Sequence, residues 1–100
     1  GMAYKPNIDD LRESPALDVW ALLEREWGAL VSYHDPHIAE IRSLGAANTQ
    51  LSPAALAEFD VVIITTNHKD VDYDLVVEHA PLILDTRNAL EQEAEHIVKL

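Results

Sequence analysis

Hydrophobic and polar positions follow two different periods along the chain. Between residues 16 and 27 the apolar side chains recur every three or four residues, which predicts an amphipathic helix with one buried face. Residues 61–66 read V-V-I-I-T-T without alternation, which is typical of a strand covered on both faces of a sheet. Further strands are expected at the shorter apolar runs of residues 2–5, 30–34, 82–84 and 97–100. Strands that alternate with helices indicate an α/β fold.

Capping residues mark where the helices begin and end. Ser14-Pro15 and Ser52-Pro53 each combine an N-cap residue with a proline at the first helical position. Gly28 and Gly45 stand where a helix end favours positive φ. The helices expected from these signals are residues 16–27, 37–44, 54–58 and 72–80, and residues 89–95 are helical or irregular. We expect one domain over residues 1–100, with three layers and a short, mostly parallel sheet whose strands lie in the order 30–34, 2–5, 61–66, 82–84.

Polar residues follow three of the expected strands. Lys5 ends the first strand, Asn67-His68-Lys69 follow the strand at residues 61–66, and Arg87 follows the strand at residues 82–84. In parallel α/β sheets the loops beyond the carboxyl ends of the strands line the crevice in which ligands bind. We therefore expect these loops to form one site. Asp35-Pro36 follows the strand at residues 30–34, and we interpret Asp35 mainly as a turn residue and cap.

The charge balance narrows the choice of ligand. The formal net charge is −11, with only seven lysines and arginines in the chain. This opposes nucleic-acid binding, and it opposes any anionic ligand unless the few basic residues converge on one site. The chain has no cysteine, which excludes disulfides and a thiolate nucleophile, and no apolar run is as long as a membrane span. We expect a cytoplasmic protein that binds neither membranes nor nucleic acid.

One stretch resembles a known family. Residues 4–15 read Y-K-P-N-I-D-D-L-R-E-S-P, and residues 85–88 read D-T-R-N. An aromatic-lysine pair, a D-x-R-x-S-P run and a later D-x-R motif are similar to the C-terminal, UDP-binding domain of the UDP-glucose/GDP-mannose dehydrogenase family. The Pro6-Asn7 pair and Glu13 look most like the UDP-N-acetylglucosamine and UDP-N-acetylmannosamine 6-dehydrogenases. The resemblance implies a Rossmann-like fold with a truncated first strand, since in the family apolar residues and a glycine precede this point.

The resemblance also implies roles for individual residues. Tyr4, Lys5 and Arg87 match positions that contact the UDP-sugar in the family, and Arg12 matches an arginine on the NAD side. Arg12 could equally pair with a neighbouring acidic residue. Asn67, His68 and Lys69 are possible crevice residues.

The family oxidises a UDP-hexose or UDP-N-acetylhexosamine to the uronic acid with NAD and a catalytic cysteine, both of which belong to an N-terminal half. The chain has no cysteine and no G-x-G-x-x-G fingerprint, so we expect it to have no catalytic residue, to bind no NAD and to be inactive alone. It would need the N-terminal half or a partner chain, and it would form a homo-oligomer. The alternative is a structural or oligomerisation remnant that has lost its ligand.

The sequence contains two incomplete metal-binding patterns. Asp70, Asp72 and Asp74 have the spacing of half a calcium loop, but Leu75 and Pro81 replace the glycine and glutamate that such a loop requires. His34 and His37 could hold zinc, but no third ligand stands nearby in the sequence. We expect no metal.

Overall fold

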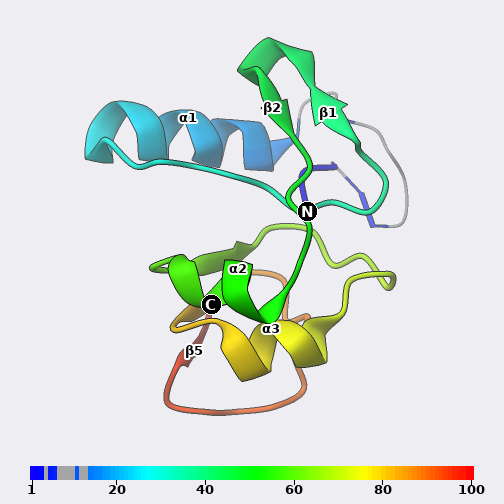
Figure 1. Ribbon diagram of the computed structural model, residues 1–100, viewed down its shortest axis with the longest axis vertical. Coiled ribbons are helices and arrows are strands. Elements are labelled where there is room, and N and C mark those ends of the chain that lie inside the picture. The colour runs from blue at the N-terminus through cyan, green and yellow to red at the C-terminus, as the bar shows by residue number, and fades with distance from the viewer. Residues whose placement is uncertain (4, 7–10, 12–13) are drawn as a thin grey trace.

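The computed structural model describes the chain except for residues 4, 7–10 and 12–13. The elements, in chain order, are α1 (Pro15–Trp27), β1 (Glu40–Ile41), the 3-10 helix η1 (Arg42–Leu44), β2 (Ala46–Ala47), α2 (Pro53–Glu58), β3 (Val62–Ile64), α3 (Tyr73–His79), β4 (Ile83–Asp85) and β5 (Ile97–Lys99). Figure 1 shows α1 and the β1–β2 hairpin above, α2, α3 and β5 below, and the N-terminus between these two parts.

The first two α-helices begin at the predicted caps. The Ser14 hydroxyl accepts a hydrogen bond from the backbone N–H of Ala16, and Ser52 caps α2 by accepting from Ala55. α1 ends at Gly28, which adopts φ 61°. Glycine takes this left-handed conformation at a helix end without steric cost. The helices expected at residues 16–27, 54–58 and 72–80 are confirmed to within one or two residues.

The main sheet is parallel and has the strand order β3-β4-β5. Val62 pairs with Ile83 and Ile83 with Ile97, so all three strands run in the same direction. α2 and α3 pack on this sheet through the buried side chains of Leu56 and Val76. The α/β class, the short parallel sheet and the last edge strand are confirmed.

The expected four-strand order is wrong. Residues 30–34 form no strand, and Tyr33 makes only an isolated bridge to Asn48. Met2, Ala3 and Lys5 belong to no strand either, and Tyr4 lies outside the described residues. The N-terminal segment is held beside β3 through side chains instead, because the hydroxyls of Thr65 and Thr66 donate to the carbonyls of Gly1 and Ala3.

The helix expected at residues 37–44 is also wrong. This segment forms β1, η1 and the start of the turn to β2, and β1 pairs antiparallel with β2. In an α-helix the Ile38 and Ala39 carbonyls would accept from amides four residues later. Here the Tyr33 hydroxyl donates to Ile38 O at 2.9 Å, and the Asn48 amide donates to Ala39 O at 2.9 Å. Hydrogen bonds to residues outside the segment therefore take the place of the bonds that a helix would make.

Two hydrophobic clusters form the core. The first is buried between α1, the N-terminal segment and the hairpin, and includes Trp20 and Tyr33, whose ring centroids are 6.3 Å apart. The second lies between the sheet and α2 and α3, and Ile83 is its most deeply buried member. No helix among the described residues is long and apolar enough to cross a membrane.

Candidate functional site

A hollow opens at the carboxyl ends of β3 and β4, where sequence patterns place the site. It has a volume of about 460 Å³ and is lined by Pro6, Asn67, Thr86, Arg87, Asn88 and Leu100. Asn67 follows β3 and Arg87 follows β4, so the structure brings two of the predicted residues together. Lys5 is exposed and precedes Pro6 in the chain, but Lys5 itself does not line the hollow. Lys69 is exposed but does not line the hollow. Tyr4 and Arg12 lie outside the described residues.

Asp85 organises the loop that carries Arg87. Its carboxylate is fully buried and accepts hydrogen bonds from the backbone N–H groups of Arg87 and Ala89, both at 3.1 Å, and of Leu90 at 2.9 Å. Asn88 adopts φ 52°, in the left-handed region that asparagine tolerates. These bonds wrap the backbone around one carboxylate and leave the exposed Arg87 side chain at the hollow.

The charge of Asp85 is stabilised by the same bonds. Burial by itself raises the pKa of Asp85, but the backbone N–H donors of Ala89, Leu90 and Arg87, with the nearby positive charge of Lys99, lower it overall. Asp85 is therefore an ionised structural residue that holds the loop, and the Arg87 side chain stays exposed at the hollow.

Asp35 has a larger role than a turn residue. One carboxylate oxygen, Oδ1, accepts from the His37 amide at 2.8 Å, as a turn residue would. The other, Oδ2, accepts from the backbone of Met2 at 2.7 Å and of Ala3 at 3.2 Å, and lies 2.8 Å from His68 Nε2. A buried carboxylate thus joins three segments that are distant in sequence, which no local pattern could have revealed.

His68 does not line the hollow. Its side chain is fully buried against Asp35, and its ring centroid lies 4.8 Å from that of His37. The expectation that His68 faces an open crevice is therefore wrong. The physical reason is that a buried carboxylate needs a hydrogen-bond donor, and His68 supplies one to Asp35. Its neighbour Asn67 faces the hollow instead.

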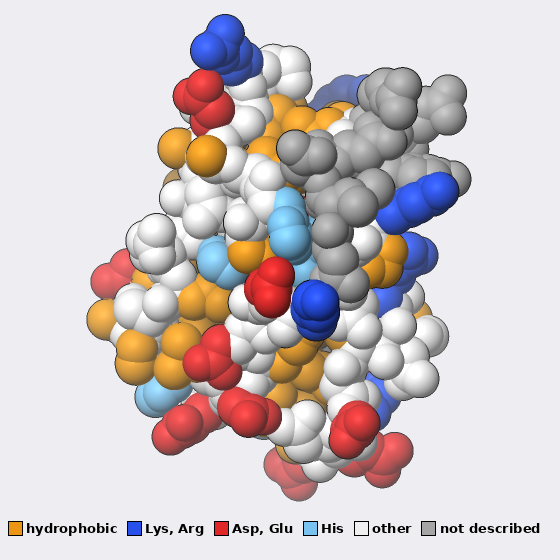
Figure 2. Space-filling view, turned by 90° about the vertical axis from the view of Figure 1, so that its right-hand side faces the viewer, with side chains coloured by type: hydrophobic (Ala, Val, Ile, Leu, Met, Phe, Trp, Pro, Cys, Tyr) orange, Lys and Arg blue, Asp and Glu red, His pale blue; other side chains and the backbone are white. Residues whose placement is uncertain are grey.

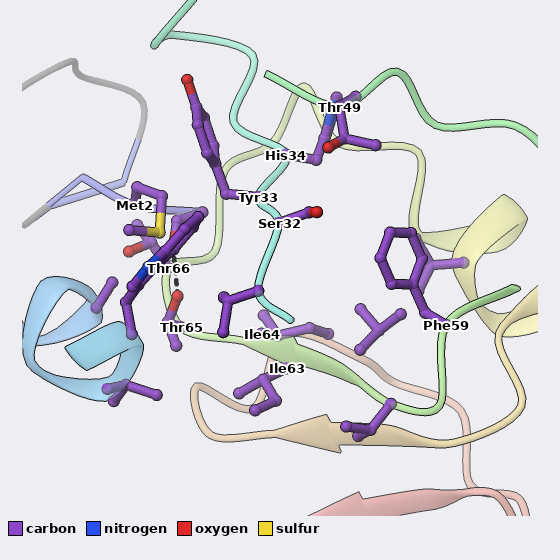
Figure 3. Close-up of a pocket in the computed structure, with 18 of the residues that line it drawn as sticks. Met2, Ser32, Tyr33, His34, Thr49, Phe59, Ile63, Ile64, Thr65 and Thr66 are labelled. Carbon is purple, nitrogen blue, oxygen red and sulfur yellow. Dashed lines mark hydrogen bonds between the residues drawn. The ribbon is translucent and has the colours of Figure 1, made fainter. Parts of the chain in front are cut away.

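An apolar groove lies on the other side of β3. It has a volume of about 230 Å³ and runs between residues 29–34 and 61–66. Figure 3 shows Met2 and Thr66 at one end and Phe59 at the other, with Ile63 and Ile64 between them. The groove borders the edge of β3 that is not paired with β4, and its lining is mostly aliphatic and aromatic.

Charged side chains are unevenly distributed over the surface. Figure 2 shows acidic side chains mainly toward the lower end of one face, whereas most basic side chains follow one side of it. No three metal-binding side chains (His, Cys, Asp or Glu) come together in the part of the chain that the structure describes.

Comparison with known proteins identifies the class to which this fold and site belong. The sequence model of the UDP binding domain of the UDP-glucose/GDP-mannose dehydrogenase family matches residues 1–92. The structure of a UDP-N-acetyl-mannosamine dehydrogenase from S. aureus superposes with a TM-score of 0.71 at 28% identity, over 99% of this chain and 24% of that one. The α/β domain is thus of the Rossmann-like kind found in nucleotide-sugar dehydrogenases.

Sequence relatives give the same result. The chain is 39% identical over 74 residues to UDP-N-acetyl-D-mannosamine dehydrogenase of Campylobacter jejuni, covering 70% of this chain and 18% of that enzyme. It is 34% identical over 101 residues to UDP-glucose 6-dehydrogenase of Rhizobium meliloti, covering 93% of this chain and 23% of that enzyme. The chain belongs to the UDP-glucose/GDP-mannose dehydrogenase family, as a UDP binding domain, and spans about a fifth of the length of these relatives.

Proposed function

We propose that the chain binds the uridine diphosphate part of a UDP-sugar in the hollow beyond β3 and β4. The observation that carries this proposal is the meeting of Asn67 and Arg87, from two separate strand ends, in one hollow of a UDP-binding-domain family member. Lys5 would add a second positive charge. Tyr4 would pack beside the base, and Arg12 would lie toward the NAD side.

Diphosphate chemistry fits the residues of this hollow. An arginine can donate two parallel N–H bonds to phosphate oxygens, and its guanidinium stays charged at any physiological pH. Asn67 and Asn88 offer amide donors beside it. Because Asp85 is engaged by three backbone amides, its charge is already compensated and repels the phosphates less than a free carboxylate would.

In a longer protein this domain would serve NAD-dependent oxidation of a UDP-hexose or UDP-N-acetylhexosamine to the uronic acid. The chain contains no cysteine, so it offers no thiolate nucleophile for that reaction. We infer that NAD and the nucleophile belong to an N-terminal half or a partner chain, that the chain alone is inactive, and that the assembled protein is a homo-oligomer. Mixing the chain with NAD and a UDP-sugar should then yield no NADH.

A structural or oligomerisation role is the second candidate. In the described part of the chain β3 pairs with a strand on one side only, and an apolar groove lies beside its other edge. Both features favour this role, because unpaired strand edges and apolar surface invite contact with another polypeptide. This candidate requires no ligand in the hollow, so a titration separates the two.

The experiment is a UDP titration of the isotopically labelled chain, followed by amide NMR shifts. We expect millimolar affinity or slightly better, because the hollow is open and the net charge is −11. Shifts should gather at Lys5, Asn67 and Arg87, and added salt should weaken binding because the contacts are partly exposed. Saturating UDP without shifts at these residues would favour the structural role.

Arg87→Ala provides the matched test of the site. It should weaken UDP binding about tenfold, which is the effect of losing one or two charged hydrogen bonds at an exposed site. Arg42→Ala is the control, because Arg42 lies in η1 with a side chain that is 91% exposed. Lys99 is unsuitable as a control, because its charge acts on Asp85. Equal losses of UDP affinity in Arg87→Ala and Arg42→Ala would show that the net charge of the chain matters and not a specific contact of Arg87.

A further inference from the structure

Asp35 stands at the junction of two of the segments that carry the proposed ligand groups. The segment of residues 1–3 leads to Lys5, and the segment after β3 contains Asn67 and His68. Asp35 Oδ2 receives hydrogen bonds from both, since it accepts from the amides of Met2 and Ala3 and lies 2.8 Å from His68 Nε2. Asp35 does not line the hollow, and its side chain is fully buried.

We propose that Asp35 is a positioning residue for the UDP site, a buried carboxylate that fixes the Lys5 segment against the Asn67 loop so that both face one hollow. The inference rests on the proposed function, and it adds a residue that touches no ligand. Thr66 supports the same junction, because its hydroxyl donates to the Ala3 carbonyl at 2.6 Å. Ala3 is therefore bound through both its N–H and its C=O.

The chemistry of the junction requires a carboxylate. Four donors surround Asp35: the amides of Met2, Ala3 and His37, and the ring of His68. An ionised carboxylate has only acceptor sites and can receive all four, whereas an asparagine must place its NH₂ group against one of these donors. Burial alone raises the pKa of Asp35, but the amides of Met2 and His37 and the His68 ring outweigh burial and lower it, which keeps the carboxylate ionised.

Substitutions at Asp35 and a distant control test the proposal. Asp35→Asn should raise the dissociation constant for UDP about tenfold, because Lys5 and Asn67 lose their common alignment. Asp60→Asn, at an exposed aspartate that does not line the hollow, should leave the dissociation constant unchanged. Amide shifts of Asn67 and of Met2 should move together in Asp35→Asn before any UDP is added. A folded Asp35→Asn chain with unchanged UDP affinity would overturn the proposal.

A second pair of variants keeps the test decisive if Asp35→Asn does not fold. His68→Gln retains an N–H donor toward Asp35, whereas His68→Leu removes it, so UDP should bind His68→Leu more weakly than His68→Gln. Equal affinities would contradict positioning through this junction.

Failure of the proposed function itself would give a different result, because the wild-type chain would then show no UDP-induced shifts at all. In that case Asp35→Asn must still shift the Met2 and Asn67 amides together, and separate responses would overturn the junction itself.

Discussion

Ser14 illustrates how much one residue does at the start of α1. Its hydroxyl oxygen accepts from the Ala16 amide, and its hydroxyl proton is donated to the carbonyl of Met2 at 2.6 Å. The first contact is local and predictable, since serine before proline is a capping signal. The second joins residues that are twelve apart and depends on the fold. A single buried hydroxyl thus connects the start of α1 to the N-terminal segment.

Ser14→Ala should therefore destabilise the chain more than loss of a cap alone. We expect a loss of about 2 to 3 kcal/mol in the free energy of unfolding, because the buried Met2 carbonyl loses its partner as well. Ser52→Ala is the control and should cost about 1 kcal/mol, since the Ser52 hydroxyl caps α2 but makes no second hydrogen bond among the described residues. Urea unfolding measures both. Equal losses would show that the Met2 contact contributes nothing.

The two buried aspartates predict how stability depends on pH. The folded-state pKa values of Asp35 and Asp85 are lowered, so both carboxylates release their protons more readily in the folded than in the unfolded chain. Their stabilising effect is complete above the unfolded pKa of about 3.9 and is lost as the pH falls toward the folded values. Unfolding free energies measured between pH 7 and pH 3 should fall only at the acidic end. Each unit by which a pKa is lowered contributes about 1.4 kcal/mol.

At the scale of elements, local signals predict helices better than strands. α1, α2 and α3 follow capping residues and apolar stripes that lie within one stretch of sequence. The segment at residues 37–44 also has a helical apolar spacing, but Tyr33 and Asn48 take its carbonyls and hold a hairpin. The site follows the same rule. Arg87 and Asn67 can be placed from strand ends, whereas the joining roles of Asp35 and His68 depend on contacts across more than thirty residues.

The end of α1 offers an element-scale test. Gly28 has φ 61°, and its amide donates to the Glu24 carbonyl at 3.1 Å. A Cβ atom at residue 28 would meet no atom within 4 Å beyond its own neighbours in the chain, so backbone strain is the main cost of alanine there. Gly28→Ala should cost about 1 kcal/mol in the free energy of unfolding, and Gly28→Asn less, because asparagine tolerates positive φ. Thermal melts of the wild type, Gly28→Asn and Gly28→Ala measure this order of stability. Identical melting temperatures for the wild type and Gly28→Ala would contradict it.

At the scale of the whole molecule, the apolar groove predicts self-association. Leu30 lines the groove and is 99% exposed, and β3 beside it is paired on one side only in the described sheet. We expect a dimer or larger oligomer by light scattering, because contact with another chain would cover this surface. Leu30→Lys should shift the chain toward the monomer, whereas Leu22→Lys, on the exposed face of α1 outside the groove, should not. A wild-type monomer at all accessible concentrations would rule this out.

The two hydrophobic clusters divide the chain almost at its midpoint. The first cluster draws on residues 2–46 and the second on residues 51–97, so each half is held mainly by its own neighbours in sequence. Such halves tend to open as separate cooperative units in hydrogen exchange. The hollow takes Pro6 from the first half and Asn67 and Arg87 from the second. A nucleotide held there would bridge both units, and its binding would slow amide exchange across the entire domain, far beyond the residues that it touches.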